Sequence, residues 1–183
     1  MGRPRRPLLV YSDASYEPLS GVPPRLGWVI IDCESGATTV STYLMEQSVV
    51  DTWLPRKQQT FAAEAIAVLT AVYNDASAIA GRDIVWFVDN EAAAASLIRG
   101  GSAKEDVNEI AEATHLLLHA IGCRLWIEWI DSGSNPSDGA SREGTGCAWA
   151  KKHGLPVHEA RGPPWLTSDT TVQALLSALW QAH

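Results

Sequence analysis

The chain has 183 residues and a hydrophobic content of 46%, which fit one globular domain, with or without a short appendage, and exclude a disordered chain. Its formal net charge of −7 argues against indiscriminate nucleic-acid binding, because proteins that bind phosphates by charge alone are normally basic. A nucleic-acid function would therefore have to depend on local basic groups or on metal ions.

The cysteines predict a reducing compartment. Cys33, Cys123 and Cys147 are odd in number and widely spaced, so they suggest neither a disulfide framework nor a zinc-type pair. No apolar run is long enough to span a membrane, and the basic N-terminus lacks the hydrophobic region of a signal peptide. We therefore expect an intracellular protein, cytoplasmic or nuclear, without a membrane partner.

Three segments are expected along the chain. Residues 1–7 form a basic N-terminal arm with three arginines and two prolines, for which a solvated tail is the simplest interpretation. Residues 8–150 form the main domain. Residues 151–183 form a C-terminal extension, irregular at first and then a short amphipathic helix from about Thr167 to Ala182.

The main domain begins with three predicted strands. Leu8–Ser15 is the first, and Asp13 lies near its far end, where an unpaired charge is costly to bury. Leu26–Cys33 and Ala37–Leu44 follow on either side of a short turn, which is typical of a hairpin. The chain therefore opens as an antiparallel meander.

A helix is predicted from about Thr60 to Ile79, after a polar connection at residues 51–59. Its apolar stripe has helical spacing, and Glu64 projects from the same stripe. A glutamate buried there without a partner would cost several kcal/mol or would remain protonated. This position favours a functional role for Glu64 over a surface glutamate that extends its carboxylate into solvent.

The next unit joins a strand to a helix through an acidic turn. Ile84–Val88 is an unbroken apolar run, which predicts a strand buried on both faces, and Ala92–Ile98 is the predicted helix. Asp89 lies at the carboxyl end of the strand, where ligands gather in α/β sheets. Alternatively, Asp89 or Asn90 only caps the helix.

The remaining predicted elements are again helices and strands in alternation. A long helix begins near Ala103 and carries His115 and His119 at a spacing that can bind metal, although solvated or structural histidines are the simpler interpretation. A strand is predicted at Cys123–Asp131. The loop after it leads to Asp138, which opens another helix.

Four acidic residues thus lie on or beside successive predicted elements: Asp13, Glu64, Asp89 and Asp138. Each lacks an adjacent basic partner in the sequence. Carboxylates that converge without cations raise each other's pKa, and a divalent ion removes this difficulty. Oxygen ligands with retained waters suit Mg²⁺.

On these residues the chain resembles the ribonuclease H family, in particular its retroelement type, within the ribonuclease H-like superfamily. The matching motifs are Tyr11-Ser12-Asp13-Ala14-Ser15, the helix Thr60-Phe61-Ala62-Ala63-Glu64-Ala65, Phe87-Val88-Asp89-Asn90, and Asn135-Pro136-Ser137-Asp138-Gly139-Ala140-Ser141-Arg142. The likeness extends from about Leu8 to Trp149. It implies an α/β, ribonuclease H-like fold with a mixed five-stranded sheet, in which two parallel strands add to three antiparallel ones, flanked by helices.

The resemblance also implies a reaction and its residues. The expected function is an endonuclease that hydrolyses the RNA strand of RNA·DNA hybrids with two Mg²⁺ ions, for which Mn²⁺ can substitute. The implied catalytic residues and metal ligands are Asp13, Glu64, Asp89 and Asp138, with Asp13 bridging the ions. We hypothesise substrate contacts at Ser15, Arg56, Lys57, Gln58, Gln59, Asn90, Asn135 and Arg142.

Two departures from the family pattern leave alternatives open. The loop at residues 131–138 lacks the histidine that many members carry, and the linker GGSAKED lacks a basic, tryptophan-containing segment. We therefore expect a module that works beside a polymerase or reverse transcriptase domain. The alternatives are a DNA exonuclease or structure-specific nuclease of the same superfamily, and a catalytically idle scaffold or binding module.

Overall fold

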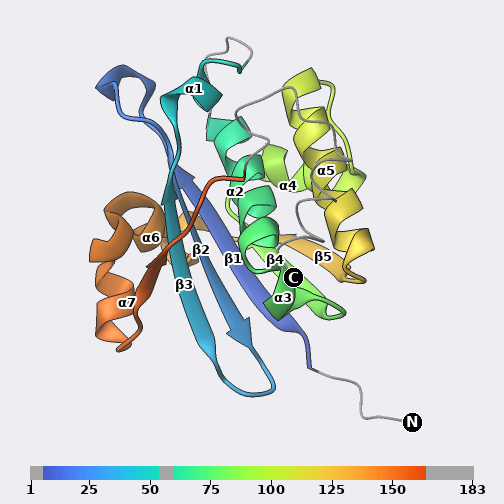
Figure 1. Cartoon of the computed structure of the whole chain (residues 1–183), viewed down its shortest axis with the longest axis vertical. Helices are drawn as coiled ribbons and strands as arrows, with labels where there is room; N and C mark the ends of the chain where they lie inside the picture. Colours follow the sequence, from blue (N-terminus) through green and yellow to red (C-terminus); the bar gives the residue numbers. More distant parts are fainter. Residues whose placement is uncertain (1–5, 54–59, 164–183) are drawn as a thin grey trace.

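Six strands form one mixed sheet in the order β5-β4-β1-β2-β3-β6 in the computed structural model, which describes residues 6–53 and 60–163 (Figure 1). The strands are β1 (Leu8–Ser15), β2 (Arg25–Asp32), β3 (Thr38–Leu44), β4 (Asp83–Val88), β5 (Arg124–Trp129) and β6 (Val157–Glu159). Strands β1, β2 and β3 are antiparallel, whereas β4 pairs in parallel with β1 and β5 in parallel with β4. The α/β class and the arrangement of the five predicted strands are confirmed.

The sixth strand was not predicted. Val157–Glu159 pairs in parallel with β3, in the register Val40↔Val157 to Thr42↔Glu159. It has only three residues and lies between glycines and prolines, so it offers no alternation to detect. After it the chain reaches the end of α2, where the backbone amide of Arg161 donates to the side chain of Asn74 at 3.3 Å.

Seven α-helices and three short 3₁₀ helices connect these strands within the described residues. The α-helices are α1 (Gln47–Val50), α2 (Thr60–Asn74), α3 (Ala76–Ile79), α4 (Glu91–Arg99), α5 (Glu105–Ala120), α6 (Asp138–Glu143) and α7 (Ala148–Lys152). The 3₁₀ helices are η1 (Pro18–Ser20), η2 (Ser132–Ser134) and η3 (Gly144–Gly146). The single helix predicted for 60–79 is divided at Asp75, whose carboxylate accepts a hydrogen bond of 2.7 Å from Trp28 Nε1 of β2. Helix α1 was not predicted.

Helix α2 is buried on all sides. Every residue from Ala62 to Val72 is buried, because α2 packs on β1 and β2 on one side and on α4 and α5 on the other (Figure 1). Many of these residues are alanines, which allow neighbouring elements to approach closely. Glu64 is therefore carried into the interior by a helix whose other residues form the core.

The opposite face of the sheet is covered only in part. Helices α6 and α7 pack over β2 and β3, where Val29, Val40 and Ala140 belong to a second buried cluster (Figure 1). Strand β4 lies outside this cover, so the prediction that it is buried on both faces was wrong. Ile84, Trp86 and Val88 are buried, but Val85 and Phe87 are only partly buried.

Several predictions fall on residues outside the described ranges. These are the amphipathic helix at 167–182, most of the basic arm at 1–7, and the segment 54–59 with Arg56, Lys57, Gln58 and Gln59. Within the described residues, no helix is both long enough and apolar enough to cross a membrane.

Candidate metal centre

The register of three strands brings Asp13 and Asp89 together. Strand β1 is paired on both sides, and Ser12 is aligned with Val88 of the parallel strand β4. The next residue of each chain segment is an aspartate, so Asp13 and Asp89 lie side by side at one end of the sheet. Asp13 is 5% exposed, and Asp89 is partly buried.

Glu64 approaches the same place from α2. Its Oε1 accepts a hydrogen bond of 3.2 Å from the backbone amide of Ala14, which joins the helix to β1. Its other oxygen, Oε2, is buried without a hydrogen-bond partner among the residues that the structure describes, and Glu64 is 2% exposed. An unpaired buried carboxylate oxygen is costly and indicates that a ligand belongs there.

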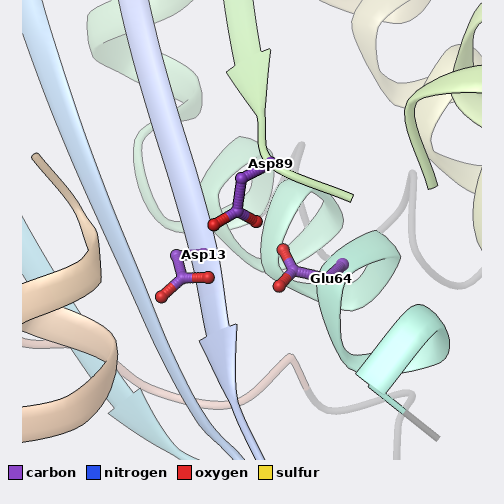
Figure 2. A group of neighbouring side chains, drawn as sticks. All are labelled: Asp13, Glu64 and Asp89. Atoms are coloured by element: carbon purple, nitrogen blue, oxygen red, sulfur yellow. The ribbon is translucent and has the colours of Figure 1, made fainter. Parts of the chain in front are cut away.

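The three carboxylates form one cluster. Figure 2 shows Asp13 from β1, Glu64 from α2 and Asp89 after β4 pointing toward one another. One oxygen from each lies within 4.8 Å of the others, and the group could hold a metal ion. The donors are all hard carboxylate oxygens, which suit Mg²⁺ or Mn²⁺ rather than a metal that prefers sulfur or imidazole.

The electrostatics of the cluster support this assignment. Burial raises the pKa of Glu64 well above its usual value, and the negative charges of Asp13 and Asp89 raise it further. The pKa of Asp89 is also raised, first by burial and then by Asp13, while a hydrogen bond from Ser132 acts in the opposite direction. A divalent cation would relieve both the repulsion and the desolvation, so these residues fit a metal ligand set.

Asp138 stands apart from this cluster. It is the first residue of α6, and its Oδ1 accepts a hydrogen bond of 2.7 Å from Nε of Arg142, one turn later in the helix. It does not belong to the close group formed by Asp13, Glu64 and Asp89. Its negative charge nevertheless contributes to the raised pKa of Asp89, as the smallest of the causes.

The loop before α6 is fastened to β1 by Asn135. This buried side chain donates a hydrogen bond of 3.1 Å from Nδ2 to the backbone carbonyl of Ser12. Its Oδ1 accepts from the amide of Ser137 at 3.1 Å and from the hydroxyl of Ser137 at 2.6 Å. Asn135, expected from the sequence to contact substrate, thus positions Asp138 relative to β1.

Two other predicted contact residues, Ser15 and Asn90, are close in sequence to Asp13 and Asp89 of the cluster. Ser15 is partly buried at the end of β1, where it pairs with Arg25. Asn90 caps α4, because its Oδ1 accepts a hydrogen bond of 3.0 Å from the amide of Ala93. Capping is therefore performed by Asn90, which leaves the carboxylate of Asp89 directed toward Asp13 and Glu64 (Figure 2).

Three residues at the site were not anticipated from the sequence. The hydroxyl of Ser141 donates to Oδ2 of Asp13, and Ser132 hydrogen-bonds to Asp89. Nε1 of Trp129 donates to the backbone carbonyl of Asp89 at 3.1 Å. Two signals were available: Ser141 belongs to the motif at residues 135–142, one helical turn after Asp138, and Trp129 ends the strand beside β4.

The two histidines of α5 do not join the cluster. Nε2 of His115 lies 2.5 Å from the carbonyl oxygen of Leu97, and His119 is exposed. His115 is thus held by α4, in keeping with the structural interpretation.

Solved structures similar to this chain were found. RNase H1 from the halophilic archaeon Halobacterium salinarum NRC-1 has 19% sequence identity and a TM-score of 0.55, with 75% of this chain and 96% of that chain covered. The N-terminal RNase H domain of a Mycobacterium tuberculosis protein, solved as a fusion with maltose-binding protein, has 14% identity and a TM-score of 0.54, with 80% and 97% covered. LC11-RNase H1 in complex with an RNA/DNA hybrid has 15% identity and a TM-score of 0.55, with 79% and 99% covered.

No protein-family model and no curated protein sequence matches the chain. The likeness is therefore one of structure, and it extends over nearly the full length of each of these solved chains. The strand order, the helices on both faces of the sheet and these similarities lead to one conclusion: the chain has the ribonuclease H fold.

Proposed function

We propose that this protein is a metal-dependent endonuclease that hydrolyses the RNA strand of RNA·DNA hybrids. The observation that carries the proposal is the buried cluster of Asp13, Glu64 and Asp89 at one end of a ribonuclease H fold. One of the similar solved structures, LC11-RNase H1, is a complex with an RNA/DNA hybrid. The substrate is assigned by analogy with that complex.

The proposed metal ligands are Asp13, Glu64, Asp89 and Asp138, and the proposed cofactor is a pair of Mg²⁺ ions that Mn²⁺ can replace. When bound, such ions activate a water molecule and neutralise charge that develops on the phosphate. The unpaired Oε2 of Glu64 supports this ligand set, as does the pKa of Glu64, which burial and the charges of Asp13 and Asp89 raise. Asp13 is close to Glu64 and Asp89 and contacts Ser141 of α6, and we propose it as the ligand shared by both ions.

Arg142 has two partners in this proposal. Its guanidinium bonds to Asp138, and the charges of Asp13 and Asp89 also raise its pKa. A substrate phosphate would compete with Asp138 for Arg142, because both are anionic oxygen acceptors. We expect this exchange to release Asp138 toward the cluster when the nucleic acid binds.

Ser15 and Asn90 are proposed as further substrate contacts from positions beside the cluster. Hybrid duplexes are recognised through 2′-hydroxyls and groove shape, for which hydroxyl and amide side chains are suited. Helix capping uses Oδ1 of Asn90, and the amide nitrogen Nδ2 is the donor that we propose contacts the duplex. Arg56, Lys57, Gln58 and Gln59 remain proposed contacts by sequence alone.

The biological setting is proposed from the sequence. The retroelement-type motifs and the short linker before α5 suggest a module that acts beside a polymerase or reverse transcriptase domain. The free cysteines Cys33, Cys123 and Cys147 favour action inside the cell.

Two alternatives remain distinguishable. A related nuclease could cut DNA with the same metal ligands, and a scaffold would cut nothing. The orphaned Oε2 of Glu64 favours an enzyme, because a scaffold gains nothing from a buried, repelled carboxylate.

The test is a panel of end-labelled substrates: RNA·DNA hybrid, double-stranded RNA, duplex DNA and both single strands. The purified full chain is incubated with Mg²⁺, Mn²⁺ or a chelator. We expect internal cuts in the RNA strand of the hybrid only, and only with metal. Cleavage of DNA would favour the related nuclease, and intact substrates with both metals would favour the scaffold.

A further inference from the structure

A buried serine outside the acidic cluster contacts the central carboxylate. Ser141 of α6 is 0% exposed, and its hydroxyl donates to Oδ2 of Asp13, 128 residues away in the sequence. The same hydroxyl lies 2.9 Å from the backbone carbonyl of Asp138. One hydroxyl has one proton, and the ionised carboxylate of Asp13 is the stronger acceptor, so the bond to Asp13 prevails.

The close approach of α6 to Asp13 depends on a glycine. In the pairing of β1 with β2, the residue opposite Asp13 is Gly27. A Cβ atom at Gly27 would lie 2.4 Å from the backbone nitrogen of Ser141 and 2.7 Å from the carbonyl carbon of Ala140. Helix α6 therefore rests on bare backbone of β2, which brings Ser141 within reach of Asp13.

A second buried hydroxyl fixes the same helix on the sheet without touching the cluster. Oγ1 of Thr42, on β3, lies 2.9 Å from the carbonyl oxygen of Ala140 and 3.1 Å from that of Leu26. Thr42 is also 0% exposed. The two hydroxyls thus differ in one respect: Ser141 bonds to a carboxylate of the cluster, and Thr42 bonds only to backbone.

The bond from Ser141 restrains the side chain of Asp13. Asp13 is repelled by Glu64 and Asp89, and an aspartate side chain can turn away from such neighbours by rotating about its two torsions. The hydroxyl holds one oxygen of Asp13 and so opposes this rotation.

We propose that Ser141 is a positioning residue of the metal centre, which holds the carboxylate of Asp13 in the orientation needed for metal binding and thereby raises the affinity for Mg²⁺. The inference rests on the proposed function, since it assumes that the cluster binds metal. It differs from a purely structural role for Ser141, which would change the stability of the protein but not its affinity for metal.

The test compares Ser141→Ala with Thr42→Val, because each removes one buried hydroxyl from the same helix contact. Mg²⁺ and Mn²⁺ binding to the full chain is measured by calorimetric titration without nucleic acid, and thermal unfolding is measured in chelator. We expect Ser141→Ala to weaken metal binding about tenfold, the lower end of the range for residues that orient metal ligands. Thr42→Val should lower the melting temperature and leave the affinity at the wild-type value.

A cleavage assay adds a second readout. In Ser141→Ala, the Mg²⁺ concentration for half-maximal cleavage should rise by the same factor as the dissociation constant, while the rate at saturating Mg²⁺ falls much less. Ser141→Cys keeps the shape of the side chain but has a weaker hydrogen-bond donor. Its affinity for metal should therefore fall between those of wild type and Ser141→Ala. It also serves as the test if the alanine variant does not fold.

Three results would overturn the inference. Wild-type affinity in Ser141→Ala and Ser141→Cys would remove the positioning role, yet the proposed function would stand if the wild-type chain still cut the hybrid. Equal weakening by Thr42→Val would assign the effect to helix packing. A wild-type chain that bound neither metal would overturn the inference and the proposed function together.

Discussion

The backbone amide of Ala14 donates a hydrogen bond to Oε1 of Glu64, and this bond joins β1 to α2 inside the acidic cluster. It satisfies one oxygen of a buried carboxylate and leaves the other without a partner. The fold therefore holds the carboxylates of the cluster together at a cost in stability.

Glu64→Gln separates the charge of this side chain from its hydrogen bond. The amide oxygen can still accept from Ala14, and the amide nitrogen can donate to a neighbouring carboxylate. We expect the metal-free variant to be more stable than wild type at neutral pH by about 1–2 kcal/mol, because a buried, repelled charge is removed. Denaturant unfolding in chelator measures the difference.

The same variant should lose hybrid cleavage by about 10³-fold, since charge stabilisation by metal amounts to several kcal/mol. A variant that was both less stable and fully active would show that Glu64 acts only as a structural contact to β1.

The stability of the metal-free protein should fall as the pH rises. The folded state raises the pKa of Glu64 above its usual value of 4.5, so above that pH the folded protein retains a proton that the unfolded chain has released. Stability therefore declines from about pH 4.5 upward until the raised pKa of Glu64 is passed, and Asp89 contributes in the same direction.

Unfolding free energies measured from about pH 5 to about pH 8 in chelator test this slope. Added Mg²⁺ should offset the decline, because metal binds the ionised carboxylates, and Glu64→Gln should flatten it. A metal-free stability that rose over this range would contradict the described electrostatics.

Gly27→Ala should displace α6. The added Cβ would meet backbone atoms of Ser141 and Ala140, which cannot rotate away as a flexible side chain could. We expect a loss of about 1–3 kcal/mol in unfolding free energy, as for other overpacked sites, together with weaker Mg²⁺ binding. Gly146→Ala is the matched control, because a Cβ at Gly146 meets no atom within 4 Å. Equal losses in both variants would remove the special role of Gly27.

Arg142→Gln tests the proposed phosphate contact. We expect weaker hybrid binding and a decrease of about 1 in the slope of log affinity against log salt concentration, as for one lost phosphate contact. Arg124→Gln removes the same charge at the start of β5, where Arg124 pairs with Asp83 at 2.5 Å. Because β4 and β5 are parallel, that pair lies at the end of the strands opposite to Asp89. An equal change in slope for both variants would indicate a general charge effect.

The strands and the acids could be predicted because their signals are local. Apolar runs marked the five long strands, and Asp13, Glu64 and Asp89 each occupied a position where a lone charge would be costly. Their convergence followed from the order of the elements, since the carboxyl end of β4 lies beside the end of β1. The pairing of Asp138 with Arg142 was not anticipated, although both residues were named and lie one helical turn apart.

What could not be predicted depends on tertiary contacts. The exposure of Val85 and Phe87 reflects how far α6 and α7 extend over the sheet, which the sequence of β4 does not encode. The bond from Ser141 to Asp13 requires a helix seated on Gly27, a contact between segments far apart in the chain. The three-residue strand β6 is formed by its pairing with β3 rather than by its own pattern.

Cleavage of a labelled RNA·DNA hybrid by wild-type protein and by Asp89→Asn tests the central claim most directly. Asparagine keeps the shape of Asp89 and removes the negative charge that a divalent ion requires. We predict that wild type cuts the RNA strand with Mg²⁺ or Mn²⁺ and not in chelator, and that Asp89→Asn remains folded but does not cut with either metal. Cleavage that survived the substitution or persisted in chelator, or a folded wild-type protein that left the hybrid intact with both metals, would contradict the account.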